Sequence, residues 1–408
     1  MPSIAPRVRV AALAVALVLC GLIAYGSPMG VDYMAPPCSP YVCDDAGPAL
    51  EALSRGDVDG FFAEQPPMGS FSLLVRAPFA AAGEALGLEL LGIYRLGAFA
   101  CVLALALLAL WLGFTMYRRG REPLVAVLVP AAIVASPVTY AALEYGHPEE
   151  LLGAALAVGA VIAAGRDRPV AAGLLLAFAV ATKQWALMAG LPVLLAAPGR
   201  RVRIVAVSAA AVALLTVPMM LANWDRFWLA QESVGIATTF KDTVTASNVW
   251  FPFADGVTDR TSTENGVEIV TQYSLDESIG HLTHPLVALL ALLATAAYFL
   301  RRRGAPPEEV LQLVALIFLV RCVFDPLTYS YHHAPFLVAL IAYEALRRRV
   351  PVMSGLAIAM LLFMTHVIAP LKDATLVNVV YLSWSLPLML VLAVRVTRRS
   401  PVATTSRT

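Results

Sequence analysis

Two groups of polar residues stand at the ends of an apolar stretch between Leu143 and Trp185. The first is residues 144–150, with the sequence EYGHPEE, and the second is residues 183–185, with the sequence KQW. Charged side chains near lipid are costly, so they usually mark a pathway or a reaction site. A carboxylate or an imidazole could move a proton, and the ammonium of Lys183 could balance an anionic leaving group such as a phosphate. We expect the fold to bring both groups to the same face of a membrane.

The composition of the chain is that of a polytopic membrane protein. Hydrophobic residues make up 59% of the 408 residues and charged residues only 14%, against usual shares of about one half and one quarter. The mean hydropathy is +0.75. The net charge is +1 and no basic stretch is interleaved with aromatic residues, so the sequence argues against a nucleic-acid partner. We expect one integral membrane domain over residues 1–408, without a soluble domain.

Clusters of arginine divide the chain into intervals that each hold about two apolar runs. Basic residues gather on cytoplasmic loops, so seven cytoplasmic clusters leave six intervals, each with an outward and a return helix. The clusters begin at Arg7, Arg118, Arg166, Arg200, Arg301, Arg347 and Arg398. This predicts an all-α, multi-pass bundle of about 12 transmembrane helices in the plasma membrane, with both termini and the tail 396–408 in the cytoplasm. The predicted spans are 9–25, 93–117, 123–141, 150–165, 169–182, 185–198, 202–221, 285–300, 308–324, 332–346, 351–368 and 375–395.

The long loops that this threading places outside should form an extracytoplasmic cap. They are residues 26–92 and 222–284. The run 69–87 in the first loop carries an arginine, a glutamate and a proline, so we expect an amphipathic helix lying in the outer interface rather than a span. Cys38 and Cys43 share the same loop, where a disulfide could persist.

Two basic residues stand near the outer ends of predicted spans. Lys183 stands at the break between the short runs 169–182 and 185–198. A lone ammonium in lipid is expensive, so Lys183 should face an outward cavity. Arg321 stands late in its span, and its spacing of four residues from Asp325 favours a structural ion pair.

The acidic group 144–150 allows two interpretations. Glu144 and His147 could contact an acceptor or hold a divalent cation, which would help to bridge a phosphate. Glu149 and Glu150 are more simply the first residues of the next helix, where carboxylates are favoured. We therefore place Glu144 and His147 in the candidate site and interpret Glu149 and Glu150 as caps. The sequence contains no zinc-binding pattern.

Four more polar residues could contact the acceptor. Gln184 and Trp185 directly follow Lys183, and His332 and His333 stand at the outer start of a later predicted span. Neighbouring residues of a helix face different sides, so we expect at most one of the two histidines to point inward.

Several short segments carry a resemblance to a known family. Residues 44–45 are paired aspartates before a short helical stretch, residues 65–70 read QPPMGS, and residues 73–78 read LLVRAP. Residues 169–183 form a run rich in alanine and leucine that contains one glycine and ends in lysine. Together they resemble the GT-C superfamily of membrane glycosyltransferases, in particular glycosyltransferase family 87.

The resemblance implies a sugar donor and a set of roles. The sugar, mannose or another hexose or pentose, would move with inversion from a polyprenyl-phosphate donor to an extracytoplasmic glycan or glycolipid of the cell envelope. Asp44 or Asp45 would act as the general base that takes the proton of the acceptor hydroxyl, and we prefer Asp44. For either aspartate the alternative role is an N-cap of the next helix. Lys183 matches the lysine at the end of the family's helix, so the resemblance implies that Lys183 contacts the donor phosphate, with Arg321 as a second candidate.

Two other classes of function fit a polytopic chain. A transporter or a lipid-linked sugar flippase should show two similar halves and charges at the membrane midplane, whereas the polar residues here gather at one face. A structural partner without catalysis is the other alternative. We expect a transferase, and the sequence leaves the sugar, the acceptor and the linkage open.

Overall fold

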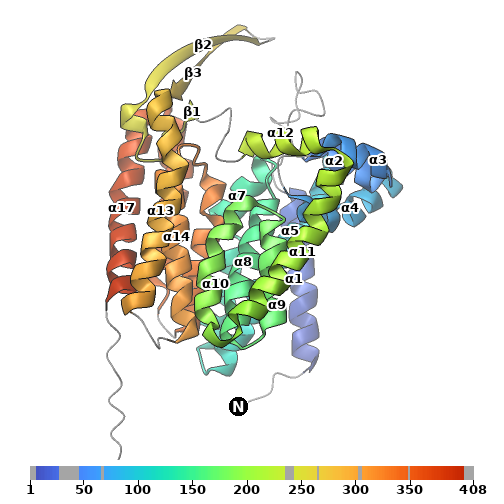
Figure 1. Ribbon diagram of the computed structural model, residues 1–408, viewed down its shortest axis with the longest axis vertical. Coiled ribbons are helices and arrows are strands. Elements are labelled where there is room, and N and C mark those ends of the chain that lie inside the picture. The colour runs from blue at the N-terminus through green and yellow to red at the C-terminus, as the bar shows by residue number, and fades with distance from the viewer. Residues whose placement is uncertain are drawn as a thin grey trace, which may run out of the picture.

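The computed structural model describes residues 6–26, 46–65, 69–234, 243–263, 266–301, 306–347 and 350–398. Asp44, Asp45, Cys38 and Cys43 lie outside these described residues, so the predicted base and the predicted disulfide stay predictions. Helices dominate the described part of the chain (Figure 1). They are α1 (Pro6–Gly26), α2 (Gly47–Ser54), α3 (Val58–Glu64), α4 (Ser70–Ala85), α5 (Leu90–Arg118), α6 (Pro123–Val134), α7 (Pro137–Glu144), α8 (Glu149–Gly165), α9 (Pro169–Val180), α10 (Gly190–Ala196), α11 (Arg201–Ala222), α12 (Trp224–Val234), α13 (Glu277–Arg301), α14 (Val310–Phe324), α15 (Ala334–Leu346), α16 (Val352–Phe363) and α17 (Ala374–Thr397).

The chain is an α-helical membrane protein, as the composition predicts. Within the described ranges, six helical segments are long and apolar enough to cross a membrane. They are Leu91–Arg118, Pro123–Glu144, Pro198–Ala222, Glu277–Arg301, Val352–Leu371 and Ala374–Thr397. Three shorter apolar helices are Val10–Gly26, Pro169–Val180 and Gln184–Ala196. The predicted bundle of helices is therefore confirmed, whereas the predicted number of twelve spans is not.

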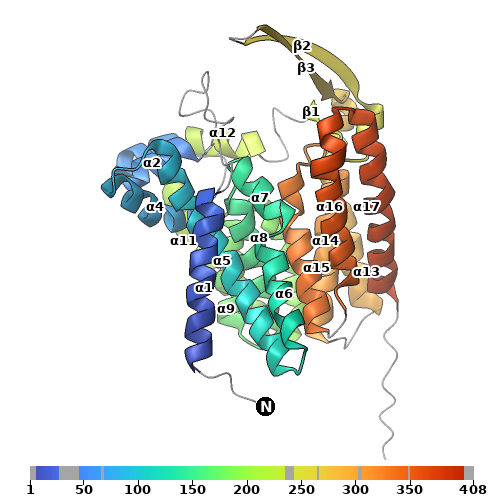
Figure 2. The same ribbon diagram turned by 180° about the vertical axis from the view of Figure 1, so that it is seen from behind.

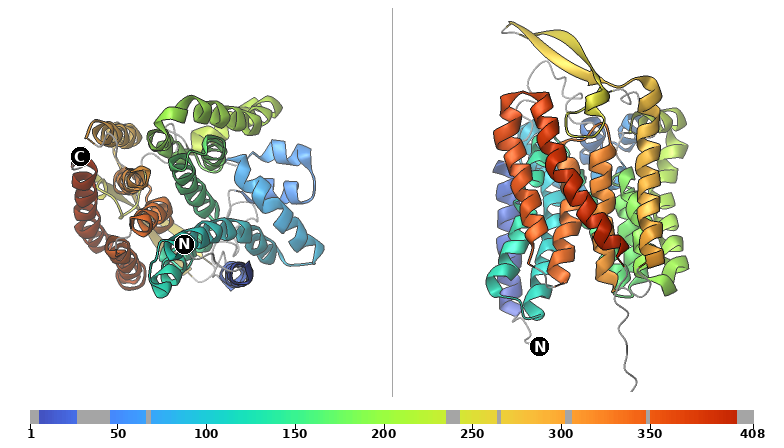
Figure 3. Two further views of the ribbon diagram at one scale, coloured as in Figure 1. Left: turned by 90° about the horizontal axis from the view of Figure 1, so that it is seen from below. Right: turned by 90° about the vertical axis from the view of Figure 1, so that its left-hand side faces the viewer.

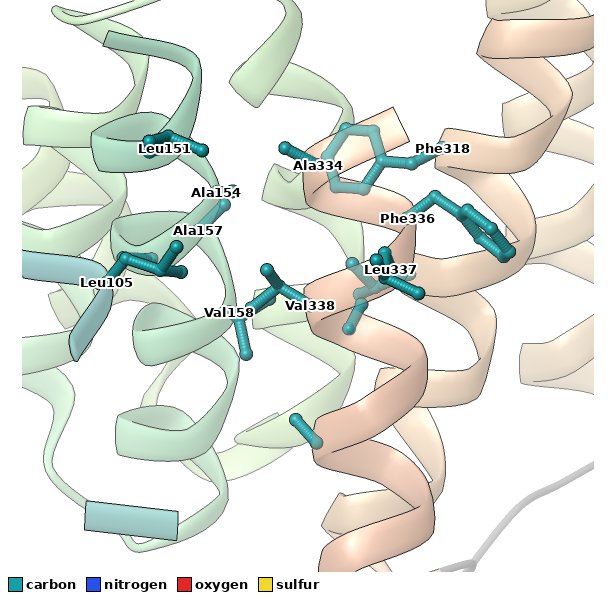
Figure 4. Packing of buried hydrophobic residues seen from close by; sticks show 14 of the residues in the cluster. Leu105, Leu151, Ala154, Ala157, Val158, Phe318, Ala334, Phe336, Leu337 and Val338 are labelled. Carbon is teal, nitrogen blue, oxygen red and sulfur yellow. The ribbon is translucent and has the colours of Figure 1, made fainter. Parts of the chain in front are cut away.

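The core of the bundle is built by three short helices, α8, α14 and α15. Nearly every side chain of these helices is buried. At 1.5 Å per residue a helix of this size is roughly 20–25 Å long, which is less than the ~30 Å of a bilayer core. Protein surrounds these helices on all sides, so they do not need the length of a helix that faces lipid. Figure 4 shows the small side chains of α8 facing those of α15: Leu151, Ala154, Ala157 and Val158 against Ala334, Leu337 and Val338.

Most of the helices run side by side, as the end-on view in Figure 3 shows. The two ends of the bundle differ. At one end the chain passes from α7 to α8, from α9 towards α10, and from α14 to α15, and we call it the site end. At the other end α5, α8 and α15 finish at Arg118, Gly165 and Leu346, next to arginine clusters, and we call it the arginine end.

The helices α2, α3, α4 and α12 gather at the site end (Figures 1 and 2). The predicted amphipathic helix 69–87 corresponds to α4, which packs against α2 and α5. Its buried face includes Leu73, Ala80 and Arg76, and Arg76 is only 1% exposed. The sequence predicts an interfacial helix here but does not assign Arg76 to either face, and the structure places it on the buried one. The guanidinium of Arg76 points into the protein, towards Glu149.

A small β-sheet in the 222–284 loop was not predicted. Its strands are β1 (Thr243–Val244), β2 (Asp255–Thr263) and β3 (Gly266–Ser274), in the order β1-β3-β2. β2 and β3 form an antiparallel hairpin, with Asp255 opposite Ser274 and Thr263 opposite Gly266. The hairpin projects beyond the helices at the site end, so it belongs to the cap rather than to the bundle (Figure 3).

The start of α4 is fixed against the end of α9, directly before Lys183. Gly69 donates its N–H to the carbonyl of Thr182 (3.2 Å), and Phe71 donates to the carbonyl of Ala181 (3.0 Å). The rings of Phe71 and Phe178 stack with centroids 4.2 Å apart. A Cβ atom on Gly69 would lie 2.0 Å from the oxygen of Ala181, so this approach requires glycine.

We expect Gly69→Ala to lower the free energy of unfolding by about 1–3 kcal/mol, because the added methyl group collides with backbone rather than with a flexible side chain. The matched control is Gly190→Ala at the start of α10, where a Cβ meets nothing within 4 Å. That variant should be neutral or up to about 1 kcal/mol more stable. Denaturant titration of both variants in the same detergent tests the difference, and equal stabilities would contradict the tight contact.

Candidate active site

The two polar groups that bound residues 143–185 meet at the site end, as the sequence predicts. The ammonium of Lys183 lies 3.0 Å from Oε1 of Glu149 and 3.7 Å from Oε1 of Glu150. Both glutamates are in the first turn of α8, where the helix dipole also favours them. Glu149 is 0% exposed and Glu150 is 1% exposed, so both are far more deeply buried than a solvated helix cap needs to be. We interpreted Glu149 and Glu150 as caps, and the structure shows that they also form the acidic centre of the site.

Arg76 of α4 is a site residue that sequence reasoning missed. Its Nη1 lies 3.8 Å from Oε2 of Glu149, on the side opposite Lys183, and both side chains are buried. His147 adds a third partner to the same carboxylate, with Nδ1 3.1 Å from Oε1. A buried charge is tolerated when opposite charges and hydrogen bonds surround it. Glu149 is therefore a buried anion between two cations and an imidazole.

Trp185 connects this cluster to α14. Its indole N–H donates to Oε1 of Glu150 (3.1 Å), and its ring lies edge-on to Phe318. The guanidinium of Arg321 lies 5.4 Å from the indole centroid, within the range of a cation–π interaction. Trp185 thus positions two charged groups, and a direct contact with the acceptor remains a proposal.

Arg321 forms the predicted ion pair with Asp325, but loosely. Nε of Arg321 lies 3.8 Å from Oδ2 of Asp325, which is beyond hydrogen-bond distance. The residue is 8% exposed, and among the described residues its Nη1 has no hydrogen-bond acceptor. A buried guanidinium donor without an acceptor costs free energy, so it points to a ligand with acceptor oxygens.

An aromatic group lies beside the ion cluster. The rings of Tyr329 and Tyr331 are stacked 5.6 Å apart, and Tyr145 lies 5.8 Å from Tyr331. His147 and His332 lie 4.8 and 4.6 Å from Tyr331, so this ring joins the aromatic group to the ion cluster. Burial raises the pKa of Tyr145 and that of Tyr329, so both phenols stay protonated and able to donate.

The two histidines face different sides, as predicted. His332 packs against Tyr331 on the site side, and its Nδ1 accepts the N–H of Tyr329 at 3.3 Å. His333 turns into the bundle, where Nε2 lies 3.0 Å from the hydroxyl of Tyr381 on α17. His333 is therefore a packing residue rather than an acceptor contact in this structure.

Two predicted site residues are not brought into the cluster. The side chains of Glu144 and Gln184 are exposed, whereas those of Glu149 and Glu150 are buried. No group of three histidine, cysteine, aspartate or glutamate side chains suited to a metal ion occurs among the described residues. His147 contacts Glu149 through Nδ1, and the pairing of Glu144 with His147 on a cation stays a prediction.

The arrangement can bind and neutralise an anion next to a polar, aromatic surface. Lys183 and Arg76 contact Glu149 at the head of α8, and Arg321 of α14 lies against Trp185, whose indole N–H donates to Glu150. Charges held in a buried site are preorganised and act more strongly than in water. These properties suit a reaction in which an anionic leaving group departs.

Two comparisons with known proteins found similarities to this chain. A model of glycosyltransferase family 87 matches residues 68–326, which is more than half of the chain. The crystal structure of ArnT from Cupriavidus metallidurans bound to undecaprenyl phosphate is similar in fold, with a TM-score of 0.51 and 16% identity. The similarity covers 97% of this chain and 78% of that one. No curated protein matches the sequence.

Proposed function

The chain belongs to glycosyltransferase family 87, and from this premise we propose that it moves a sugar from a polyprenyl-phosphate donor to an extracytoplasmic acceptor. The donor sugar is a hexose or pentose such as mannose, and the acceptor is a glycan or glycolipid of the cell envelope. The observation that carries the proposal is the contact of Lys183 with the buried carboxylates of Glu149 and Glu150, together with the buried Arg321 that lies against Trp185 at the same end of the bundle.

The donor phosphate is assigned to Lys183 and Arg321. The departing phosphate gains negative charge as the bond to the sugar breaks, and cations aimed at it stabilise the transition state. Arg321 presents a buried Nη1 with no acceptor among the described residues, and Lys183 lies 3.7 Å from Glu150, the carboxylate to which Trp185 donates. The fold of ArnT, whose crystal structure is bound to undecaprenyl phosphate, supports a lipid phosphate as the ligand.

The general base is assigned to the Asp44–Asp45 pair. Glu149 is an unsuitable base, because a carboxylate that is held by a lysine, an arginine and an imidazole has little tendency to take a proton. The described residue next to the pair is Ala46, which is buried before α2, and α2 packs against the helix of Arg76. We keep Asp44 as the preferred base.

The acceptor is assigned to the aromatic group of Tyr145, Tyr329, Tyr331 and His332. Aromatic faces suit a sugar ring, and the phenols and the imidazole can hydrogen-bond its hydroxyl groups. Gln184 and Trp185, which directly follow Lys183, remain proposed acceptor contacts. Glu144 is exposed, so it contacts only an acceptor that extends beyond the buried Glu149 and Glu150.

The membrane orientation follows from the distribution of arginine. Arg118, Arg119, Arg166 and Arg347 are at the end opposite the site, and basic residues favour the cytoplasmic side. We therefore propose that the protein lies in the plasma membrane with the site extracytoplasmic and both termini cytoplasmic. Membership of a glycosyltransferase family favours transfer over the transport alternative.

Binding of a lipid phosphate tests the phosphate assignment separately from turnover. Undecaprenyl phosphate should raise the melting temperature of the purified protein, and undecaprenol, which lacks the phosphate, should not. We expect Arg321→Gln and Lys183→Gln each to weaken this binding about 10- to 100-fold, since a hydrogen bond to a charged group contributes roughly 1.5–3 kcal/mol.

The matched control is Lys372→Gln. Lys372 is an exposed lysine between α16 and α17, at the site end but with no ion pair to a described residue. Its replacement should leave the affinity for undecaprenyl phosphate unchanged. Equal affinities of the Arg321, Lys183 and Lys372 variants would contradict the phosphate assignment.

A further inference from the structure

A second charged hollow lies at the arginine end, far from the candidate active site. It has a volume of about 310 Å³, including its open mouth, and is lined by the final turns of α5, α8 and α15 and by the start of α14. α8, α14 and α15 each contribute to the candidate active site at their other ends. The hollow is therefore a separate feature, and its function does not depend on the proposed transfer reaction.

Positive charge collects at this hollow. Arg119 and Arg166 line it together with one carboxylate, Glu308. Glu308 is already engaged, because Arg119 donates to its Oε1 at 3.2 Å, and Arg119 also donates to the carbonyl of Leu346 at 2.6 Å. The carboxylate of Glu308 thus neutralises the charge of Arg119, and the charge of Arg166 is not neutralised by an ion pair with the described residues of the hollow.

Arg166 is held in place without a carboxylate partner. Its guanidinium lies 4.2 Å from the centroid of the Trp111 ring, and no carboxylate of the described residues lies within 4.0 Å of it. Partial burial, together with the nearby Arg119, Arg118 and Arg168, lowers the pKa of Arg166. Arg166 and these three neighbouring guanidinium groups repel one another, and a bound anion would offset that repulsion.

The walls of the hollow are apolar. Val161, Ile162, Leu311 and Leu346 line it between the basic groups, and the ring of Trp111 forms a further wall. A free inorganic anion would gain nothing from these side chains, whereas a lipid carries a phosphate and hydrocarbon in one molecule. Basic pockets between helices at the cytoplasmic face of a membrane are typical sites for anionic lipid head groups.

We propose that this hollow binds the phosphate head group of an anionic phospholipid from the adjoining leaflet. Arg166 donates to the phosphate oxygens, Trp111 fixes the guanidinium plane, and the aliphatic walls contact the glycerol and the first methylene groups. The lipid connects the ends of α5, α8, α14 and α15, so its binding stabilises the arginine end of the bundle.

The test uses the full chain in nanodiscs of phosphatidylcholine with increasing phosphatidylglycerol, read out by melting temperature and by native mass spectrometry of retained lipid. We expect phosphatidylglycerol to be retained and to raise the melting temperature. Arg166→Gln should weaken this binding about fivefold, the contribution of one basic side chain near an anionic lipid. The matched control is Arg203→Gln, an exposed arginine on α11 at the same end, which should bind as the unmodified protein does.

A second variant should act in the opposite direction. Glu308→Gln removes the carboxylate and releases Arg119, so phosphatidylglycerol should bind about fivefold more tightly. Inorganic phosphate at the same concentration should have no effect on either readout. Stabilisation by inorganic phosphate alone, or equal binding by the Arg166, Arg203 and Glu308 variants, would overturn the lipid site.

Discussion

Replacing the catalytic aspartate with asparagine is expected to lower the rate of sugar transfer about 10²- to 10⁴-fold, the usual contribution of a general base. Of the two variants Asp44→Asn and Asp45→Asn, we expect the larger loss at Asp44. Asparagine keeps the shape of the side chain and can still cap a helix, but it cannot take the proton of the acceptor hydroxyl. The initial rate of transfer from a polyprenyl-phosphate sugar, measured in detergent or nanodiscs, tests this result.

The other aspartate should behave as a cap. Its replacement should cost at most about 1 kcal/mol of stability and leave the rate within a few-fold of the unmodified protein. Binding of undecaprenyl phosphate should be unchanged in both variants, because the phosphate is assigned to Lys183 and Arg321. This separates a loss of proton transfer from a loss of the donor site.

The matched control is Asp59→Asn. Asp59 is an exposed aspartate in the first turn of α3 with no ion pair to a described residue, so its variant should transfer sugar normally. Full activity in both the Asp44 and Asp45 variants would place the base elsewhere. Glu150→Gln would then be the next variant, because Oε2 of Glu150 has no hydrogen-bond partner among the described residues.

The sequence could predict that the two polar groups meet, because this depends only on the end of the bundle at which each loop lies. Counting arginine clusters puts residues 144–150 and Lys183 at one end, and the contact between Lys183 and Glu149 confirms this. The number of spans could not be fixed in the same way. Hydropathy does not distinguish a helix that faces lipid from one that protein encloses, and α8, α14 and α15 are enclosed.

The role of each carboxylate could not be predicted, because it depends on partners that are distant in sequence. The helix dipole alone explains acids at positions 149 and 150, so nothing local pointed to the lysine more than thirty residues later or to Arg76. An arginine in an apolar run was the available signal for Arg76, since such residues face the protein interior rather than lipid.

The β-hairpin had a local signal in the sequence. Asn265-Gly266 is a dipeptide typical of tight hairpin turns, and β-branched residues occur on both sides of it. The hydrophobic composition of the whole chain predicts membrane helices, and it outweighs this local signal for a hairpin. The all-helical prediction fails in this loop. The loop lies outside the bundle, where the backbone can hydrogen-bond to water and need not be helical.

Glu149→Gln is expected to lower the free energy of unfolding by about 3–5 kcal/mol, the cost of removing one partner from a buried ion pair. Glu149 is fully buried, with Lys183 at 3.0 Å, His147 at 3.1 Å and Arg76 at 3.8 Å. Glutamine fills the same volume but removes the negative charge that Glu149 places beside the buried guanidinium of Arg76 and the ammonium of Lys183. Denaturant titration in mixed micelles, followed by tryptophan fluorescence, measures the loss.

Two further variants separate charge from packing. Glu144→Gln changes an exposed glutamate of the same acidic group and should alter the stability by no more than about 0.5 kcal/mol. The double variant Glu149→Gln with Arg76→Gln removes both buried charges, so it should be more stable than the sum of the single losses predicts, by about 0.5–3 kcal/mol. If Glu149→Gln were as stable as Glu144→Gln, or if the double variant were strictly additive, Arg76 and Glu149 would not be coupled. Arg76 would then have no part in holding the acidic centre of the site, and its burial on α4 would need another cause.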